Sequence, residues 1–69
     1  MIEFKTNPND TRMMSGNGKR GEYTITEKTS HNRIWWEVTL FTFDEPDSIA
    51  IAPDVELAEA FVNWFDEIK

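Results

Sequence analysis

The chain has no cysteine and one histidine among its 69 residues. Without cysteine, disulfide bonds, thiolate zinc sites and a thiol nucleophile are all excluded. His31 has no second histidine or cysteine to share a metal ion with, and we expect it in an exposed turn. We therefore expect no metal, no cofactor and no catalytic residue, and we expect a protein that is not an enzyme.

Long apolar runs are also absent. No stretch approaches the roughly 20 apolar residues that cross a bilayer. The first residues, MIEFKT, do not combine a basic region with an apolar one, so a secretory signal is not expected. The sequence predicts a single small domain over residues 1–69 that does not bind membranes and is located in the cytoplasm of a bacterium or an infected host cell.

Basic residues are scarce in the second half of the chain. Residues 1–33 carry six Lys or Arg against four Asp or Glu, a net charge of +2, whereas residues 34–69 carry nine acidic residues against one lysine, a net charge of −8. Such an asymmetric charge repels nucleic acid from the acidic side and attracts cationic partners to it.

The most apolar stretch is IWWEVTLFTF, residues 34–43, and its branched and aromatic side chains predict a strand. Alternation places Trp35, with the rings at 41 and 43, on one face, and the other face carries Ile34, Trp36, Val38 and Leu40. Both faces are apolar, and one helix can cover only one of them. We expect the second face to be covered by residues 2–16 or by another chain.

Strands are also predicted at residues 2–6, 22–28 and 48–52, with hairpin turns at 29–32 and 44–47. Residues 7–21 contain three glycines and several Asn, Asp and Ser residues. They predict a long flexible loop, with two local alternatives. One is a short helix from Pro8 to Met14, and the other is a ribbon from Met13 to Tyr23 turning at Asn17-Gly18.

A helix is predicted from Val55 to Ile68, begun by Asp54 as cap or by Pro53 at the first helical position. The fold class is α+β: a three- to four-stranded antiparallel meander with one C-terminal helix packed on one face. The strand at residues 2–6 can lie at either edge. We expect the helix to contact the sheet through Leu57, Phe61, Trp64 and Phe65.

The acidic residues of the helix and of the turn at residues 44–47 are the main candidate site. They predict a small protein-binding module that imitates the charge of DNA and inhibits or modulates a basic, nucleic-acid-binding partner. Trp35 is the expected aromatic anchor. The full set of candidate residues is Trp35, Asp44, Glu45, Asp47, Glu56, Glu59, Asn63, Asp66 and Glu67.

Two alternatives remain open. The first is direct binding of nucleic acid through the basic residues Arg12, Lys19, Arg20, Lys28 and Arg33. The second is a homodimer formed through Trp35, Phe41 and Phe43. In size and layout the chain is similar to many small bacterial or bacteriophage accessory proteins, although no motif names a family.

Overall fold

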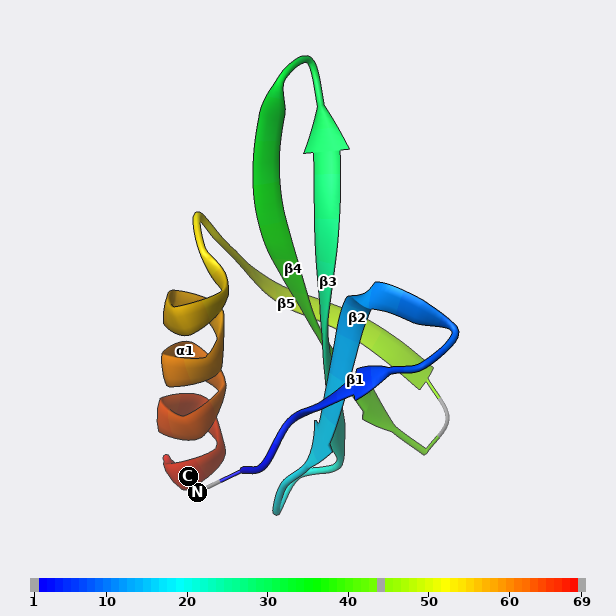
Figure 1. Ribbon diagram of the computed structural model, residues 1–69. Helices are drawn as coiled ribbons and strands as arrows, with labels where there is room; N and C mark the ends of the chain where they lie inside the picture. Colours follow the sequence, from blue (N-terminus) through cyan, green and yellow to red (C-terminus); the bar gives the residue numbers. More distant parts are fainter. Residues whose placement is uncertain (1, 44, 69) are drawn as a thin grey trace.

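The computed structural model describes residues 2–43 and 45–68, which form one five-stranded antiparallel sheet and one helix (Figure 1). Each strand pairs with the next one in sequence. The α+β meander is therefore confirmed, with five strands where three or four were expected. The elements are β1 (Lys5–Asn7), β2 (Asp10–Asn17), β3 (Glu22–Ser30), β4 (Arg33–Thr42), β5 (Glu45–Ala52) and α1 (Val55–Glu67).

Residues 7–21 are mostly strand and turn, so the prediction of a long flexible loop was wrong. The short helix from Pro8 to Met14 is also absent, because β2 occupies most of that segment and pairs with β3. The alternative ribbon is confirmed, and its turn is closed by a 2.9 Å hydrogen bond from the Gly18 N–H to the Gly21 carbonyl. Backbone pairing with β3 stabilises a segment whose composition alone favours a loop.

The first strand starts later than predicted and lies beside β2. The strand predicted at residues 2–6 is reduced to the three residues of β1 at one edge of the sheet. Ile2 and Phe4 lie before β1 in the chain, and both pack against the core. Figure 1 shows this N-terminal segment running from the C-terminal end of α1 into the sheet.

The central hairpin matches its prediction closely. β3 and β4 pair in continuous register from Glu22 opposite Phe41 to Ser30 opposite Arg33. His31 and Asn32 form the turn with φ values of 50° and 67°, the left-handed conformations that two-residue hairpin turns require. His31 is exposed there, as expected.

The core lies between the sheet and α1. Tyr23, Ile25 and Val38 from the sheet and Ala58 and Val62 from the helix are completely buried. Asp54 caps the helix, because its side chain accepts a 2.8 Å hydrogen bond from the Leu57 N–H. The register of β5 shifts at one position, where Ile49 is an extra residue between Ser48 and Ala50. Such a bulge increases the local bend of a strand.

The helix contacts the sheet through fewer of its apolar residues than expected. Phe61 and Phe65 pack against the core, as predicted. Leu57 and Trp64 do not, since 52% and 58% of their surfaces are exposed. The sheet covers only one sector of the helix, and this part of the packing prediction was wrong.

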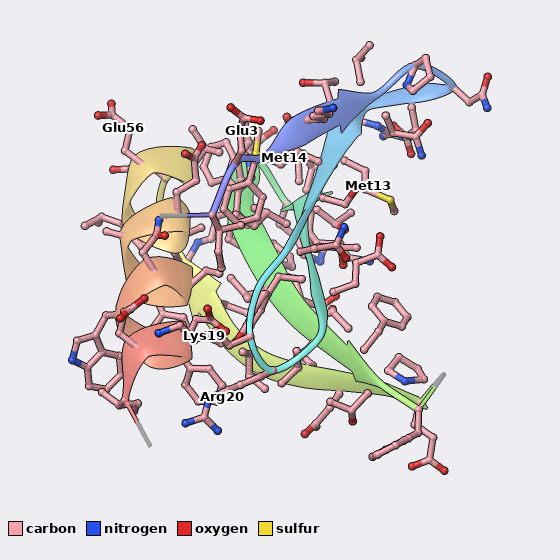
Figure 2. All side chains as sticks on the ribbon, turned by 90° about the horizontal axis from the view of Figure 1, so that it is seen from below. Glu3, Met13, Met14, Lys19, Arg20 and Glu56 are labelled. Atoms are coloured by element: carbon pink, nitrogen blue, oxygen red, sulfur yellow. The ribbon has the colours of Figure 1, made fainter. Side chains whose placement is uncertain are left out.

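The second face of the sheet is not covered by residues 2–16, which was the first of our two alternatives. Ile2, Phe4 and Met14 pack on the same core as the helix. Met14 lies on the helix side of β2, and Met13 points away from it (Figure 2). Alternation from the buried Val38 places Trp35 on the outer face, where it is half-buried.

Candidate functional site

Asp66 is buried against the turn between β2 and β3, although the sequence placed it on an exposed acidic face. Only 6% of its surface is exposed. Its carboxylate accepts hydrogen bonds from the backbone N–H groups of Lys19 and Arg20 at 3.0 and 3.1 Å, and from the Tyr23 hydroxyl at 3.0 Å. Asp66 is therefore a structural acceptor and is not available to a partner.

This network shifts two pKa values in opposite directions. Burial acts to raise the pKa of Asp66, but the hydrogen bonds from Lys19, Arg20 and Tyr23 and the charge of Lys19 outweigh it, so the pKa lies below its ordinary value. Burial and the hydrogen bond to Asp66 raise the pKa of Tyr23 to about 12. At neutral pH the pair is a charged acceptor and a neutral donor.

Lys19 and Arg20 contact the C-terminal end of the helix (Figure 2). The Lys19 ammonium lies 3.2 Å from a Glu67 carboxylate oxygen. The Arg20 guanidinium donates a hydrogen bond to the Ile68 carbonyl and lies 5.0 Å from the centre of the Phe65 ring. These cations complement the negative end of the helix dipole, which gives them a structural role that sequence reasoning missed.

The other candidate basic residues lie elsewhere. Arg12 pairs with Asp10 at 3.4 Å, and Lys28 lies 3.8 Å from Glu37 on the neighbouring strand. Arg33 begins β4 and is exposed. The five residues proposed to bind nucleic acid are thus divided between the β2–β3 turn, at Lys19 and Arg20, and the region of β2 and the β3–β4 hairpin.

A row of exposed apolar side chains runs along α1 beside its buried face. Spacings of four and three residues place Leu57, Phe61 and Trp64 on one line along the helix, and Ile68, the C-cap residue, follows just beyond its last turn. Leu57 is 52% exposed, Trp64 58% and Ile68 39%, whereas Phe61 is half-buried and stacks against Phe65. We call this row the helix stripe: Leu57, Phe61, Trp64 and Ile68.

Only some of the acidic residues of the helix lie near this stripe, because Glu59 is on a different face and Asp66 is buried. Glu56 and Glu67 are exposed. Glu59 is half-buried, as is Asn63, whose side-chain oxygen accepts a 2.8 Å hydrogen bond from the Ile2 N–H. Asn63 therefore holds the N-terminal segment, and the exposed carboxylates nearest to the stripe are those of Glu56 and Glu67.

The acidic turn is separated from the helix. Glu45 and Asp47 are exposed at the start of β5, and Asp44 lies outside the described residues. Figure 1 places the start of β5 on the side of the molecule opposite α1. The structure therefore does not join the candidate acidic residues into one surface, and Trp35 belongs to neither group.

Trp35 lines a shallow apolar recess of about 350 Å³ near the start of β4. Ile34 and Ile51 are 54% and 68% exposed there, which leaves much of this apolar surface in contact with water. Arg33 supplies a positive charge at the rim. The recess is lined by Arg33, Ile34, Trp35, Ile51, Ala52 and Pro53.

Phe43 follows β4 at its opposite end. Its side chain is 99% exposed, and its backbone has a φ of 51°, in the left-handed region that bulky residues rarely adopt. The remaining ring of the predicted dimer contact, Phe41, is half-buried within β4. The three rings at 35, 41 and 43 therefore do not form one continuous patch.

Across residues 2–43 and 45–68, no group of three or more His, Asp or Glu side chains is arranged to hold a metal ion. The single helix in this part of the chain is too short to span a membrane. Comparison with known protein families, with characterised proteins and with solved structures finds no match. The functional interpretation therefore rests on the geometry described above.

The helical spacing contained a signal for Asp66. It follows Ala58 and Val62 at intervals of four residues, and both of those residues are completely buried. Residues four apart lie on the same face of a helix. A carboxylate aligned with two core residues needs buried donors, and the β2–β3 turn supplies them.

Proposed function

We propose that the chain is a protein-binding module that docks α1 on a basic macromolecular partner and thereby inhibits or modulates it. A nucleic-acid-binding protein is the expected class of partner. The single observation that carries the proposal is the helix stripe, in which Leu57, Trp64 and Ile68 remain in contact with water beside the exposed carboxylates of Glu56 and Glu67.

The stripe has the composition of an interface anchor. Fully burying a large apolar side chain contributes about 1.5–3 kcal/mol, and Trp is enriched among the residues that dominate binding energy. About half of the Leu57 surface and more than half of the Trp64 surface remain to be buried. A partner that covers both side chains gains roughly half of this contribution from each of them, without any rearrangement of the helix.

The spacing of the stripe favours an elongated docking surface. Leu57 and Trp64 are seven residues apart on α1, which is the repeat of helices that pack side by side. An amphipathic helix presenting such a row docks in an apolar groove or against another helix. The partner surface is therefore expected to be apolar and about as long as the helix.

Charge favours a basic rim on that surface. The chain has a net charge of −6, and Glu56 lies next to the stripe together with Glu67, whose charge is partly offset by Lys19 at 3.2 Å. A second copy docked helix to helix would bring acidic flanks near one another, where like charges repel. Lys or Arg side chains along a partner groove complement them and accelerate association.

Direct nucleic-acid binding has less support. Two of the five basic residues considered for it, Lys19 and Arg20, contact the helix C-terminus. Arg12 and Lys28 each have an acidic neighbour within 4 Å. Neutralised cations contribute little to the counterion release that drives binding to phosphates.

The proposal can be tested by quantitative capture from a lysate of the source organism with the full chain as bait. We expect one basic protein to be enriched, and its purified form to bind with a Kd weakened by roughly 10- to 100-fold by Trp64→Ala or Leu57→Ala. Ile34→Ala is the matched control, because Ile34 is 54% exposed and belongs to β4 rather than to the helix stripe.

The acidic contribution is tested separately with Glu56→Lys and Glu67→Lys. Both side chains are exposed, but Glu67→Lys also replaces the ion pair with Lys19 by a repulsion, so circular dichroism must verify its fold and Glu56→Lys is the cleaner variant. We expect slower association and a weaker dependence on salt concentration. Unchanged binding by Trp64→Ala and Leu57→Ala would refute the helix as the docking element.

A further inference from the structure

The two ends of β4 carry complementary features. Phe43, with Glu45 and Asp47 shortly after it, lies at one end, and the apolar recess beside Arg33 lies at the other. The strand has ten residues, so these ends are roughly 30 Å apart. Figure 1 shows the β3–β4 hairpin projecting at one end of the molecule and the β4–β5 connection at another.

Phe43 has the properties of an inserted side chain without its receptor. Nearly all of its surface is exposed, and its left-handed backbone is unfavourable for an aromatic residue. Both features oppose the stability of an isolated chain. A receptor that buries the ring would remove the unfavourable exposure of Phe43 to water.

The recess provides matching chemistry. Ile34, Trp35 and Ile51 give it apolar walls, and its volume of about 350 Å³ exceeds that of a phenyl ring. Arg33 is the one charged residue among the described residues that line it. An aromatic side chain accompanied by carboxylates is the ligand that these walls and this rim complement.

We propose that the chain associates with itself head to tail, with Phe43 of one copy inserted in the recess at Ile34, Trp35 and Ile51 of the next. Glu45 and Asp47 of the first copy then face Arg33 of the second. The inference is independent of the proposed docking of α1, because the helix stripe contributes to neither surface.

The contact joins two different surfaces, so each copy in a pair retains one unused Phe43 or one unused recess. Assembly of this kind continues as a linear series unless its rotation closes a ring. One aromatic anchor in a shallow recess gives a small interface, and we expect association at protein concentrations of roughly 0.1–1 mM.

The test is sedimentation equilibrium of the full chain across that concentration range. The apparent mass should rise above the monomer mass of 8.1 kDa and continue to rise beyond two chains at the highest concentrations. Phe43→Ser and Ile51→Glu should each remain monomeric. Both positions are exposed, at 99% and 68%, and circular dichroism verifies that the fold is retained.

Mixing the two variants identifies the geometry. Phe43→Ser retains the recess and Ile51→Glu retains the aromatic ring, so an equimolar mixture should form two-chain complexes and stop there. Leu57→Ser, an exposed position of the helix stripe, should associate like the unmodified chain. A monomeric unmodified chain, a monomeric mixture, or assembly lost in Leu57→Ser would each overturn the inference.

Discussion

The two turns on either side of β3 have similar compositions and opposite structural roles. The β2–β3 turn contains Lys19 and Arg20, and the β3–β4 turn is flanked by Lys28 and Arg33. The first turn is fixed against α1 by the Asp66 carboxylate. The second has exposed residues at its tip and projects beyond the helix (Figure 1).

The difference arises from one buried acceptor. Asp66 receives two backbone N–H groups of the first turn, and this brings Lys19 and Arg20 against the negative end of the helix. The second turn satisfies its backbone within the hairpin, using left-handed conformations at His31 and Asn32. Basic residues near a turn therefore reveal little about function until the acceptors around them are known.

Removing the acceptor should produce the largest effect. Asp66→Ala leaves two backbone N–H groups and the Tyr23 hydroxyl without their partner, and we expect a loss of about 3–5 kcal/mol in the free energy of unfolding. The whole domain is expected to have only roughly 3–10 kcal/mol. Urea denaturation followed by tryptophan fluorescence measures the loss. Glu67→Ala, one residue away and exposed, removes only the surface ion pair with Lys19 and should change it by at most about 1 kcal/mol.

The same contact predicts the pH dependence of stability. Because the pKa of folded Asp66 is lowered, its stabilisation is complete above the ordinary value of 3.8 and is lost as the pH falls through the folded pKa. Because the pKa of Tyr23 is raised to about 12, its stabilisation is complete below 10.0 and is lost as the pH rises toward 12. In the variant Asp66→Asn, the free energy of unfolding should fall less steeply as the pH is lowered below 3.8. In Tyr23→Phe, it should fall less steeply as the pH is raised above 10.0. If both variants kept the pH dependence of the unmodified chain, Asp66 and Tyr23 would not be its cause.

The second largest difference in stability between the two turns is expected from substitutions at their left-handed residues. Gly21 has a φ of 150°, and a Cβ there would collide with the Phe41 carbonyl oxygen. We expect Gly21→Ala to lower the free energy of unfolding by about 2–4 kcal/mol. Asn32→Gly, at a φ of 67° in the other turn, should leave it unchanged or raise it by up to about 1 kcal/mol. Thermal denaturation measures both variants. If Gly21→Ala and Asn32→Gly lowered the stability equally, the two turns would not differ in their backbone requirements.

Much of the architecture followed from local patterns. The alternating residues of β3 and β4 and the turn residues between them have short-range physical causes and were predicted, and the Asp54 cap was one of the two predicted starts of the helix. β2 was harder, because Asn, Ser and Gly favour loops and only pairing with β3 makes the segment a strand. The number of strands therefore exceeded the prediction.

The candidate site was less predictable than the fold. The helix carries more apolar surface than one face of the sheet can cover, so its spacing could not tell which residues remain exposed. Leu57 and Trp64 were assigned to the core and Asp66 to the surface, and the structure reverses both assignments. The positions relative to the sheet depend on how the helix is rotated, which is a tertiary property.

The smallest predicted effect on stability is the difference between removing Arg20 from the first turn and removing Arg33 beside the second. Arg20 donates to the Ile68 carbonyl and lies over the Phe65 ring, so Arg20→Ala should lower the free energy of unfolding by about 1 kcal/mol. Arg33 is exposed at the start of β4, and Arg33→Ala should change it by less than about 0.5 kcal/mol. Urea denaturation of both variants in parallel, at a concentration too low for self-association, resolves this difference. A loss at Arg33 as large as that at Arg20 would mean that the projecting turn is also held by tertiary contacts.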